Sequence, residues 1–175
     1  EWPAYVLTRG DVFLRSARPR VSMTTIHHLV LINAPVAKVY AAISTADGIS
    51  TWWDKQTPIQ TNGGLVLEHN PGPEHGVVKL RVVELIQNQR VEWECISSHP
   101  KSSPASAWTG THFVFEMAEH DDEVAPESKD DRIHATTLDF SQTGYDERSE
   151  FFESNNLAWG GVLRNLKKVV ESQHN

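Results

Sequence analysis

The chain has 175 residues, 39% of them hydrophobic and 22% charged, which is an ordinary composition for one soluble globular domain. The formal net charge of -7 argues against a general nucleic-acid-binding protein, which would carry a basic surface. Cys95 is the single cysteine and excludes an intramolecular disulfide, and no apolar run approaches the ~18 residues of a membrane span. We therefore expect a cytoplasmic protein without a membrane span or a nucleic-acid partner.

Residues 1–22 differ in composition from the rest of the chain. They hold four arginines, two acidic residues and two prolines, without sustained periodicity. The first β-rich stretch follows Met23 directly, so we expect a single domain over residues 23–175. Residues 1–22 are then an N-terminal extension, either upstream sequence or a vector-derived segment. An Arg-rich, acid-poor transit peptide is the alternative.

The first part of the domain predicts a strand and two short helices. Residues 25–33 are rich in β-branched and apolar side chains and end before Pro35, which suits the first turn of a helix. Residues 46–48 interrupt this helix, and a second short helix or turn leads to Trp52 and Trp53. Adjacent tryptophans are costly to leave in water, so at least one ring is expected against the core or a cleft.

The middle of the chain alternates between apolar and polar residues and is punctuated by turn residues, which predicts an antiparallel sheet. The expected strands cover residues 65–69, 77–86, 90–97, 109–118 and 133–141. The acidic stretch 119–132 is expected to be a solvated hairpin loop. A calcium site is the alternative, although the ligand spacing of a calcium-binding loop is missing.

The last part of the chain, residues 146–172, has apolar residues at the spacing of one broad helical stripe, with acids early and bases late. We expect one long amphipathic helix that covers the sheet, with Gly144 at the turn before it. Gly160 and Gly161 lie in mid-helix, where each costs about 1 kcal/mol relative to alanine. They indicate close packing or a kink at this point or, alternatively, room for a ligand.

Three short sequences add detail to this order of elements. They are Ile32-Asn33-Ala34-Pro35-Val36 with Val39-Tyr40, the pair Trp52-Trp53, and Trp108-Thr109-Gly110-Thr111 with Phe113 and Phe115. With them, residues 24–171 resemble the SRPBCC or START-like superfamily, and in particular the Aha-type domain related to activators of the heat-shock-protein ATPase. Many relatives have His-x-Gly before the last helix, where this chain has Gln142-Thr143-Gly144.

The resemblance implies a fold and a binding site. The fold is the α+β helix-grip, in which a curved antiparallel sheet of about six to seven strands wraps a long C-terminal helix, with two short helices after the first strand. Relatives use the cavity between sheet and helix to hold lipids, polyketides or other apolar molecules. The side chains expected to line it here are Trp53, His69, Trp93, Phe113, Phe115, Leu138, Phe140, Trp159 and Leu163. Each is a candidate ligand contact and, alternatively, plain core.

Catalysis has no positive signal in the sequence. His27 and His28 are adjacent on a strand, so their side chains point to opposite faces and cannot share a metal ion in regular geometry. His69 has the parity of the inward residues of its strand and is expected at the mouth of the cavity. Cys95 is expected to be an inert buried thiol. We predict no catalytic residue, metal or cofactor, and the balance is against an enzyme.

Three functional hypotheses follow. The first is binding of an apolar small molecule, lipid-like or polyketide-like, in the cavity. The second is an interaction protein that resembles the activators of chaperone ATPases and has a chaperone as its partner. The third is an enzyme of the cyclase or hydrolase kind that uses the same cavity. The sequence leaves open whether the protein is a monomer or a homodimer.

Overall fold

The structure, a computed structural model, describes residues 22–120 and 134–173. Its elements in chain order are β1 (Met23–Ile32), α1 (Val36–Ser44), α2 (Ala46–Ile49), β2 (Thr57–Thr61), β3 (Gly64–His69), β4 (Val78–Ile86), β5 (Arg90–Cys95), the short 3-10 helix η1 (Pro104–Ala107), β6 (His112–His120), β7 (Ala135–Asp146) and α3 (Phe152–Ser172). All neighbouring strands pair antiparallel in one seven-stranded sheet of order β1-β7-β6-β5-β4-β3-β2. The predicted helix-grip architecture is confirmed.

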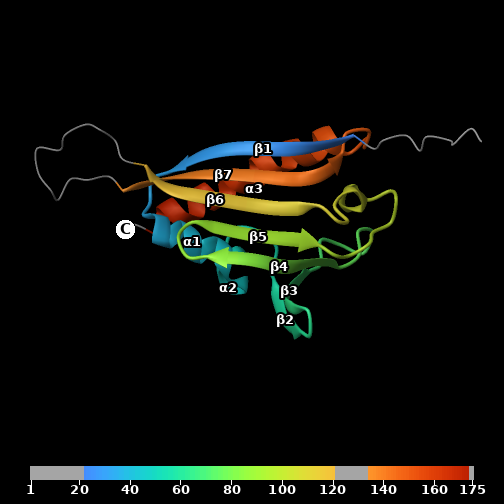
Figure 1. The fold of residues 1–175 in the computed structure, drawn as a ribbon, viewed down its shortest axis with the longest axis horizontal. Coiled ribbons are helices and arrows are strands. Elements are labelled where there is room, and N and C mark those ends of the chain that lie inside the picture. The colour runs from blue at the N-terminus through green and yellow to red at the C-terminus, as the bar shows by residue number, and fades with distance from the viewer. Residues whose placement is uncertain (1–21, 121–133, 174–175) are drawn as a thin grey trace, which may run out of the picture.

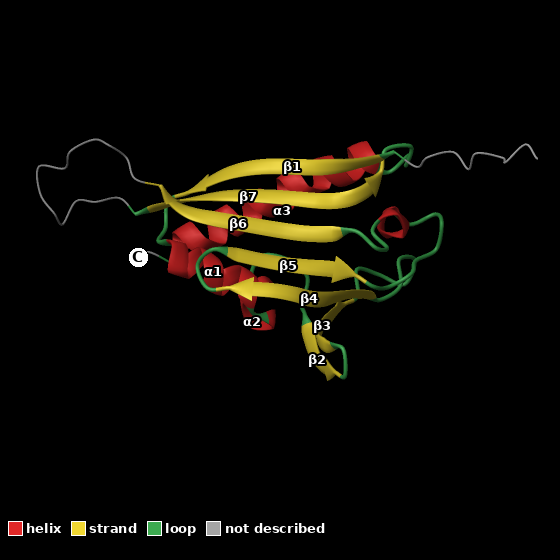
Figure 2. Ribbon diagram, viewed as in Figure 1, coloured by secondary structure: helices red, strands yellow, loops and turns green. Residues whose placement is uncertain are grey.

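The helices lie on one side of this curved sheet. α3 runs behind the strands in Figure 1, with its C-terminal end next to α1, while the opposite side of the sheet carries no helix among the described elements (Figure 2). Near the end of α3, Glu171 Oε1 accepts a hydrogen bond from the backbone N–H of Asn33, at 2.8 Å. The core lies between the sheet and α3, because the inward side chains of both are apolar and exclude water together.

Local sequence accounts for the helix and turn boundaries near the site. α1 begins directly after Pro35, whose backbone is already fixed for a helix entry. α2 is capped by Thr45, whose Oγ1 accepts a hydrogen bond from the N–H of Gly48 at 3.0 Å. The β4–β5 hairpin turns at Asn88, which has a φ of 59°, a left-handed conformation that asparagine tolerates.

The long helix starts later than the sequence predicted. It begins at Phe152, whereas the apolar and charged pattern placed its start at residue 146. β7 continues to Asp146 because β1 pairs with it to the end, with Met23 opposite Asp146. Tyr145 is fully buried in this extension of the strand. Gly144 lies inside β7 with a φ of 77° and is not the turn before the helix.

Two strand predictions also need correction. β2 was not predicted, because all of its residues are exposed and Pro58 interrupts any strand pattern. The strand predicted at 109–118 begins only at His112 and continues through His120. Gly110, with a φ of 79°, takes the backbone just before it into a turn. Glu119 is therefore part of a strand rather than of the predicted acidic loop.

Some predictions fall on residues that the structure does not describe. These are residues 121–132 of the predicted acidic loop, with its calcium alternative, and residue 133 of the strand predicted after it. All of the expected N-terminal extension except Ser22 also lies outside the described residues. Within the described ranges, no helix combines the length and the apolar character that crossing a membrane requires.

Candidate functional site

A cluster of aromatic rings fills the space between the helix-covered face of the sheet and α3. Its buried members are Trp93 on β5, Phe113 and Phe115 on β6, Phe140 on β7 and Trp159 on α3. The ring centroids of Phe140 and Trp159 are 4.3 Å apart, and those of Trp93 and Phe115 are 4.8 Å apart. Such contacts are favourable beyond the burial of apolar area. The sheet and α3 are therefore joined by direct ring contacts.

The aliphatic residues predicted for the site belong to the same core. Leu138 on β7 and Leu163 on α3 are fully buried, and every apolar residue predicted for the site belongs to this core or, like Trp53, packs against it. The structure therefore brings the predicted residues together. Their role as ligand contacts stays a prediction.

Trp53 enters the cluster from the loop between α2 and β2. Its ring centroid lies 5.2 Å from that of Trp159, 6.3 Å from that of Trp93 and 6.1 Å from that of Trp108. The imidazole of His69 is closer still, at 4.7 Å. Trp53 is half-buried, whereas Trp93 and Trp159 are buried. Its indole therefore closes the cluster at the solvent edge.

The neighbouring Trp52 anchors this loop. Its Nε1 donates a hydrogen bond to the carbonyl of Ala42 in α1 at 2.7 Å, and its own carbonyl accepts one from Asn165 Nδ2 of α3 at 2.6 Å. The Trp52 ring is buried in the core and stacks on Trp53, with centroids 6.1 Å apart. The prediction that at least one of the two rings is buried is confirmed.

His69 is a buried, neutral base next to Trp53. Only 4% of the residue is exposed, which is deeper than the predicted position at the mouth. Burial lowers its pKa to about 4, against an opposing effect of Asp54 and with a further lowering by His99. Its Nε2 faces Asp54 Oδ2 at 4.0 Å, and its Nδ1 has no hydrogen-bond partner among the described residues.

Two more buried polar groups, on Gln56 and Trp108, lack a hydrogen-bond partner among the described residues, and neither residue was predicted for the site. Gln56 is 5% exposed, and its Nε2 donates to the Asp54 carbonyl at 2.7 Å, while its Oε1 has no partner in the described part of the chain. The indole Nε1 of Trp108 is in the same situation. Trp108 is part of one of the short sequences that carry the family resemblance, whereas no sequence feature indicated a functional role for Gln56.

A buried hydrogen-bond chain holds the inner side of the cluster. Trp159 Nε1 donates to Gln142 Oε1 at 3.1 Å, Gln142 Nε2 donates to Thr111 Oγ1 at 3.0 Å, and Thr111 Oγ1 donates to the Trp108 carbonyl at 2.7 Å. The chain connects α3, β7 and the loop before β6. Because each buried group is paired, Trp159 is fixed in orientation. Gln142 is the residue at which this chain departs from the His-x-Gly pattern.

The structure favours the packing explanation for Gly160 in α3. A Cβ added to Gly160 would meet the imidazole of His28 on β1 at 3.4 Å, and that imidazole contacts the Asn156 carbonyl at 3.1 Å through Nε2. Gly160 thus lets β1 and α3 approach closely. At Gly161, the nearest atom to an added Cβ is a guanidinium nitrogen of Arg164, at 3.7 Å.

Within the described residues, neither the thiol of Cys95 nor the side chains that can bind metals form a reactive centre. Cys95 is buried, and burial raises the pKa of its thiol, so little thiolate forms at neutral pH. No group of three or more His, Cys, Asp or Glu residues in the described ranges is arranged to hold a metal ion.

An open groove of about 830 Å³ lies where β1 begins and β7 ends, and its lining includes none of the predicted site residues. Its lining includes Met23, His99, Lys101, Asp146, Arg148 and Phe151.

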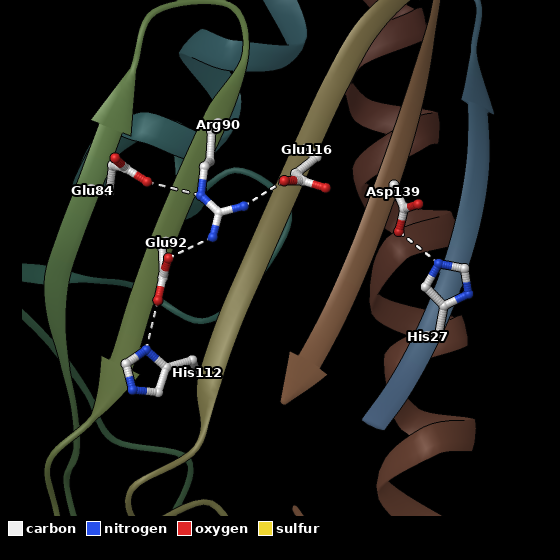
Figure 3. Close-up of polar contacts among 7 residues, drawn as sticks. All are labelled: His27, Glu84, Arg90, Glu92, His112, Glu116 and Asp139. Carbon is white, nitrogen blue, oxygen red and sulfur yellow. Dashed lines mark hydrogen bonds and ion pairs between the residues drawn. The ribbon is translucent and has the colours of Figure 1, made fainter. Parts of the chain in front are cut away.

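The outer face of the sheet carries a group of ion pairs (Figure 3). Arg90 contacts Glu84, Glu92 and Glu116 at 2.9, 2.7 and 2.5 Å. Burial acts to raise the pKa of Glu92, but hydrogen bonds from Arg90 and His112 outweigh it, so the pKa is lowered. These side chains point away from the aromatic cluster and stabilise the exposed side of the sheet.

Comparisons with known proteins identify the fold. No protein-family model and no curated protein matches the chain by sequence. Among solved structures, the Aha1 dimer from Colwellia psychrerythraea is similar with a TM-score of 0.65 and 22% identity, over 87% of this chain and 99% of that one. A Mesorhizobium loti protein, MLL2253, has a TM-score of 0.63 and 17% identity over 87% and 99%.

A third similar structure is DynU16, from the dynemicin biosynthetic locus, with a TM-score of 0.59 and 14% identity over 85% of this chain and 48% of that one. These likenesses extend over 85–87% of this chain. The resemblance predicted from the sequence is confirmed at the level of the fold: the chain has the fold that the Aha1 protein from Colwellia psychrerythraea, MLL2253 and DynU16 share.

Proposed function

We propose that this protein binds an apolar small molecule, lipid-like or polyketide-like, in the space between the sheet and α3 that the indole of Trp53 fills in this structure. The position of Trp53 is the observation that carries the proposal. Trp53 is a half-buried residue on a loop, and its ring contacts the buried rings of Trp93 and Trp159. A ligand with a flat apolar body would make the same contacts if the indole rotated outward.

The attachment of the loop supports such a rotation. The hydrogen bonds that hold the loop to α1 and α3 are made by Trp52. Trp53 can therefore leave the cluster without breaking them. DynU16, which has this fold, belongs to a biosynthetic locus, and this supports a small-molecule role without identifying the ligand.

Binding is favoured over catalysis by the state of His69. It is a titratable group with a shifted pKa inside the cluster, as an enzyme would require. With a pKa of about 4, however, it is a weak base at neutral pH, and general-base catalysis is most efficient when the pKa lies near the working pH. We infer that His69 contributes hydrogen bonding.

The test is a titration with N-phenylnaphthylamine, a neutral probe whose fluorescence rises in apolar surroundings. We expect saturable binding that fits one site per chain. Removal of the indole in Trp53→Ala is expected to raise the affinity for the probe about tenfold, because the variant lacks the ring contacts that a ligand must displace. The matched control is Leu157→Ala, an exposed apolar residue of α3, with unchanged affinity. No saturable binding by either the native protein or Trp53→Ala contradicts the proposal.

A second candidate function is interaction with a chaperone. The edge strand β1 exposes Leu29 and Leu31 on the outer face, with 66% and 46% of each residue exposed, which suits a protein contact. A protein with this fold is described as an Aha1 dimer, and the same edge would serve a homodimer. Stimulation of a purified heat-shock-protein ATPase, lost in Leu29→Ser/Leu31→Ser, tests this role, and an unstimulated ATPase rejects it. Both functions are proposed for a cytoplasmic protein.

A further inference from the structure

The chemical class of the ligand can be narrowed from the polar groups around Trp53. Gln56 Oε1, His69 Nδ1 and Trp108 Nε1 are buried and have no hydrogen-bond partner within the described residues. Buried polar groups of proteins are nearly always hydrogen-bonded. Two of these exceptions are on rings that contact Trp53, and the third is on the same loop, which indicates that this region can receive polar atoms of another molecule.

Two of these groups belong to rings that contact the Trp53 indole. The ring centroid of His69 is 4.7 Å from that of Trp53, and the ring centroid of Trp108 is 6.1 Å from it. A molecule that takes the place of the indole would therefore lie against both rings. Gln56 is on the same loop as Trp53, and its amide N–H group bonds to the Asp54 carbonyl while its Oε1 is left over.

The unpaired groups differ in what they offer a ligand. An indole N–H can only donate, so Trp108 needs an acceptor, and an amide oxygen can only accept, so Gln56 needs a donor. For His69, the Asp54 carboxylate faces Nε2 at 4.0 Å, which favours the proton on that nitrogen and leaves the Nδ1 lone pair as an acceptor. A hydroxyl group both donates and accepts, and so suits the whole set.

The charges around the site disfavour an anionic ligand. The groups that act on His69 are the carboxylate of Asp54 and the imidazole of His99. Burial keeps the His69 imidazole neutral, so it offers no positive charge to a carboxylate or phosphate, and Asp54 would repel one. A charged molecule would also lose its hydration among buried rings.

We propose that the ligand is a neutral hydroxylated aromatic molecule whose ring replaces the Trp53 indole and whose hydroxyl groups bond to Trp108 Nε1–H and His69 Nδ1. The proposal rests on the proposed function, because it concerns the same site. It goes beyond that function in excluding plain hydrocarbons and carboxylates as preferred ligands.

The test compares three probes of nearly equal size: para-cresol, para-xylene and para-toluate. Their affinities are measured by NMR titration of the full chain, with the indole N–H signals as reporters. The Trp108 signal is assigned by its loss in Trp108→Phe. We expect para-cresol to bind about tenfold more tightly than para-xylene, para-toluate to bind more weakly than either, and the Trp108 N–H signal to move downfield with para-cresol alone.

Two variants separate hydrogen bonding from packing. Trp108→Phe and His69→Phe keep an aromatic ring and remove the polar atom, so each should reduce the preference for para-cresol while para-xylene binding persists. The matched control is His27→Phe on the outer face of the sheet, where His27 pairs with Asp139 (Figure 3). It should leave the preference unchanged. If a variant fails to fold, the probe comparison on the native protein still decides the question.

Each outcome has a distinct meaning. Equal binding of para-cresol and para-xylene, with no movement of the Trp108 signal, overturns the hydroxylated-ligand inference and leaves the proposed apolar site intact. Binding of para-toluate as tight as that of para-cresol overturns the neutral class. If neither neutral probe binds up to about 1 mM, this inference and the proposed function both fail.

Discussion

The imidazole of His69 lies against the indole of Trp53, with ring centroids 4.7 Å apart. Trp53 is half-buried, whereas His69 is buried. The same contact links the proposed binding event to the protonation of His69, because a molecule that displaces Trp53 changes the surroundings of the imidazole.

The stability of the protein should fall in a pH range set by His69. Its pKa is lowered from 6.5 to about 4 in the folded state, so between these values the unfolded chain binds the proton more readily. The free energy of unfolding therefore decreases as the pH falls through this range, by on the order of 3 kcal/mol at the limit. Urea unfolding at stepped pH should show a shallower decrease for His69→Phe, and identical pH profiles would contradict the assignment.

Replacing Trp159 with phenylalanine should lower the stability of the protein more than the same replacement of Trp53 does. In Trp159→Phe, Gln142 Oε1 loses its donor in a fully buried position, which costs about 1–3 kcal/mol in addition to the smaller ring. Trp53→Phe is the matched control, since Trp53 is half-exposed. We expect a lower urea midpoint for Trp159→Phe than for Trp53→Phe. The reverse order would show that the Gln142 bond contributes little.

The two glycines of α3 should respond differently to alanine. Gly161→Ala should stabilise the protein by about 0.5–1 kcal/mol, because alanine restricts the unfolded chain and favours the helix. Gly160→Ala should gain less or lose stability, because its Cβ would press on the imidazole of His28 at 3.4 Å. Chemical denaturation of both variants measures the difference. Equal gains would remove the close-packing role of Gly160.

The ion pairs of Arg90 should contribute a small, salt-dependent stability. Arg90→Leu leaves Glu84, Glu92 and Glu116 facing one another on the outer face (Figure 3), and we expect a loss of about 1 kcal/mol at low ionic strength. The loss should shrink in about 1 M salt, where charges are screened within roughly 3 Å. Arg90→Lys, which keeps the charge, is the control. A loss that is independent of salt would point to packing instead.

Much of the fold could be predicted because buried strands and helices leave periodic patterns. The inward residues of β4 and β6 and the buried stripe of α3 follow such patterns. β2 could not be predicted, because all of its residues are exposed and the strand therefore lacks an alternation of buried and exposed side chains. The end of β7 was also mispredicted, because the burial of Tyr145 depends on pairing with β1, which lies far away in the sequence.

The apolar part of the candidate site and His69 could be predicted from the sequence, but the other polar groups could not. Strand parity identified Trp93, Phe113 and Phe140, since the direction of a side chain follows from its position in a strand. The unpaired state of Gln56 depends on how a loop folds back on Asp54, which no local pattern reveals. Trp108 carried a sequence signal, but its contact with Trp53 needed the assembled sheet.

The anchoring of Trp52 has a kinetic consequence. Because Ala42 and Asn165 hold this residue, the loop has little freedom to open as a body, and access to the cluster depends on the side-chain torsions of Trp53. The opening of loops and domains takes up to milliseconds, and rotation of the Trp53 side chain does not require such an opening. Amide hydrogens of the loop should therefore exchange at the same rate whether the Trp53 indole lies inside or outside the cluster.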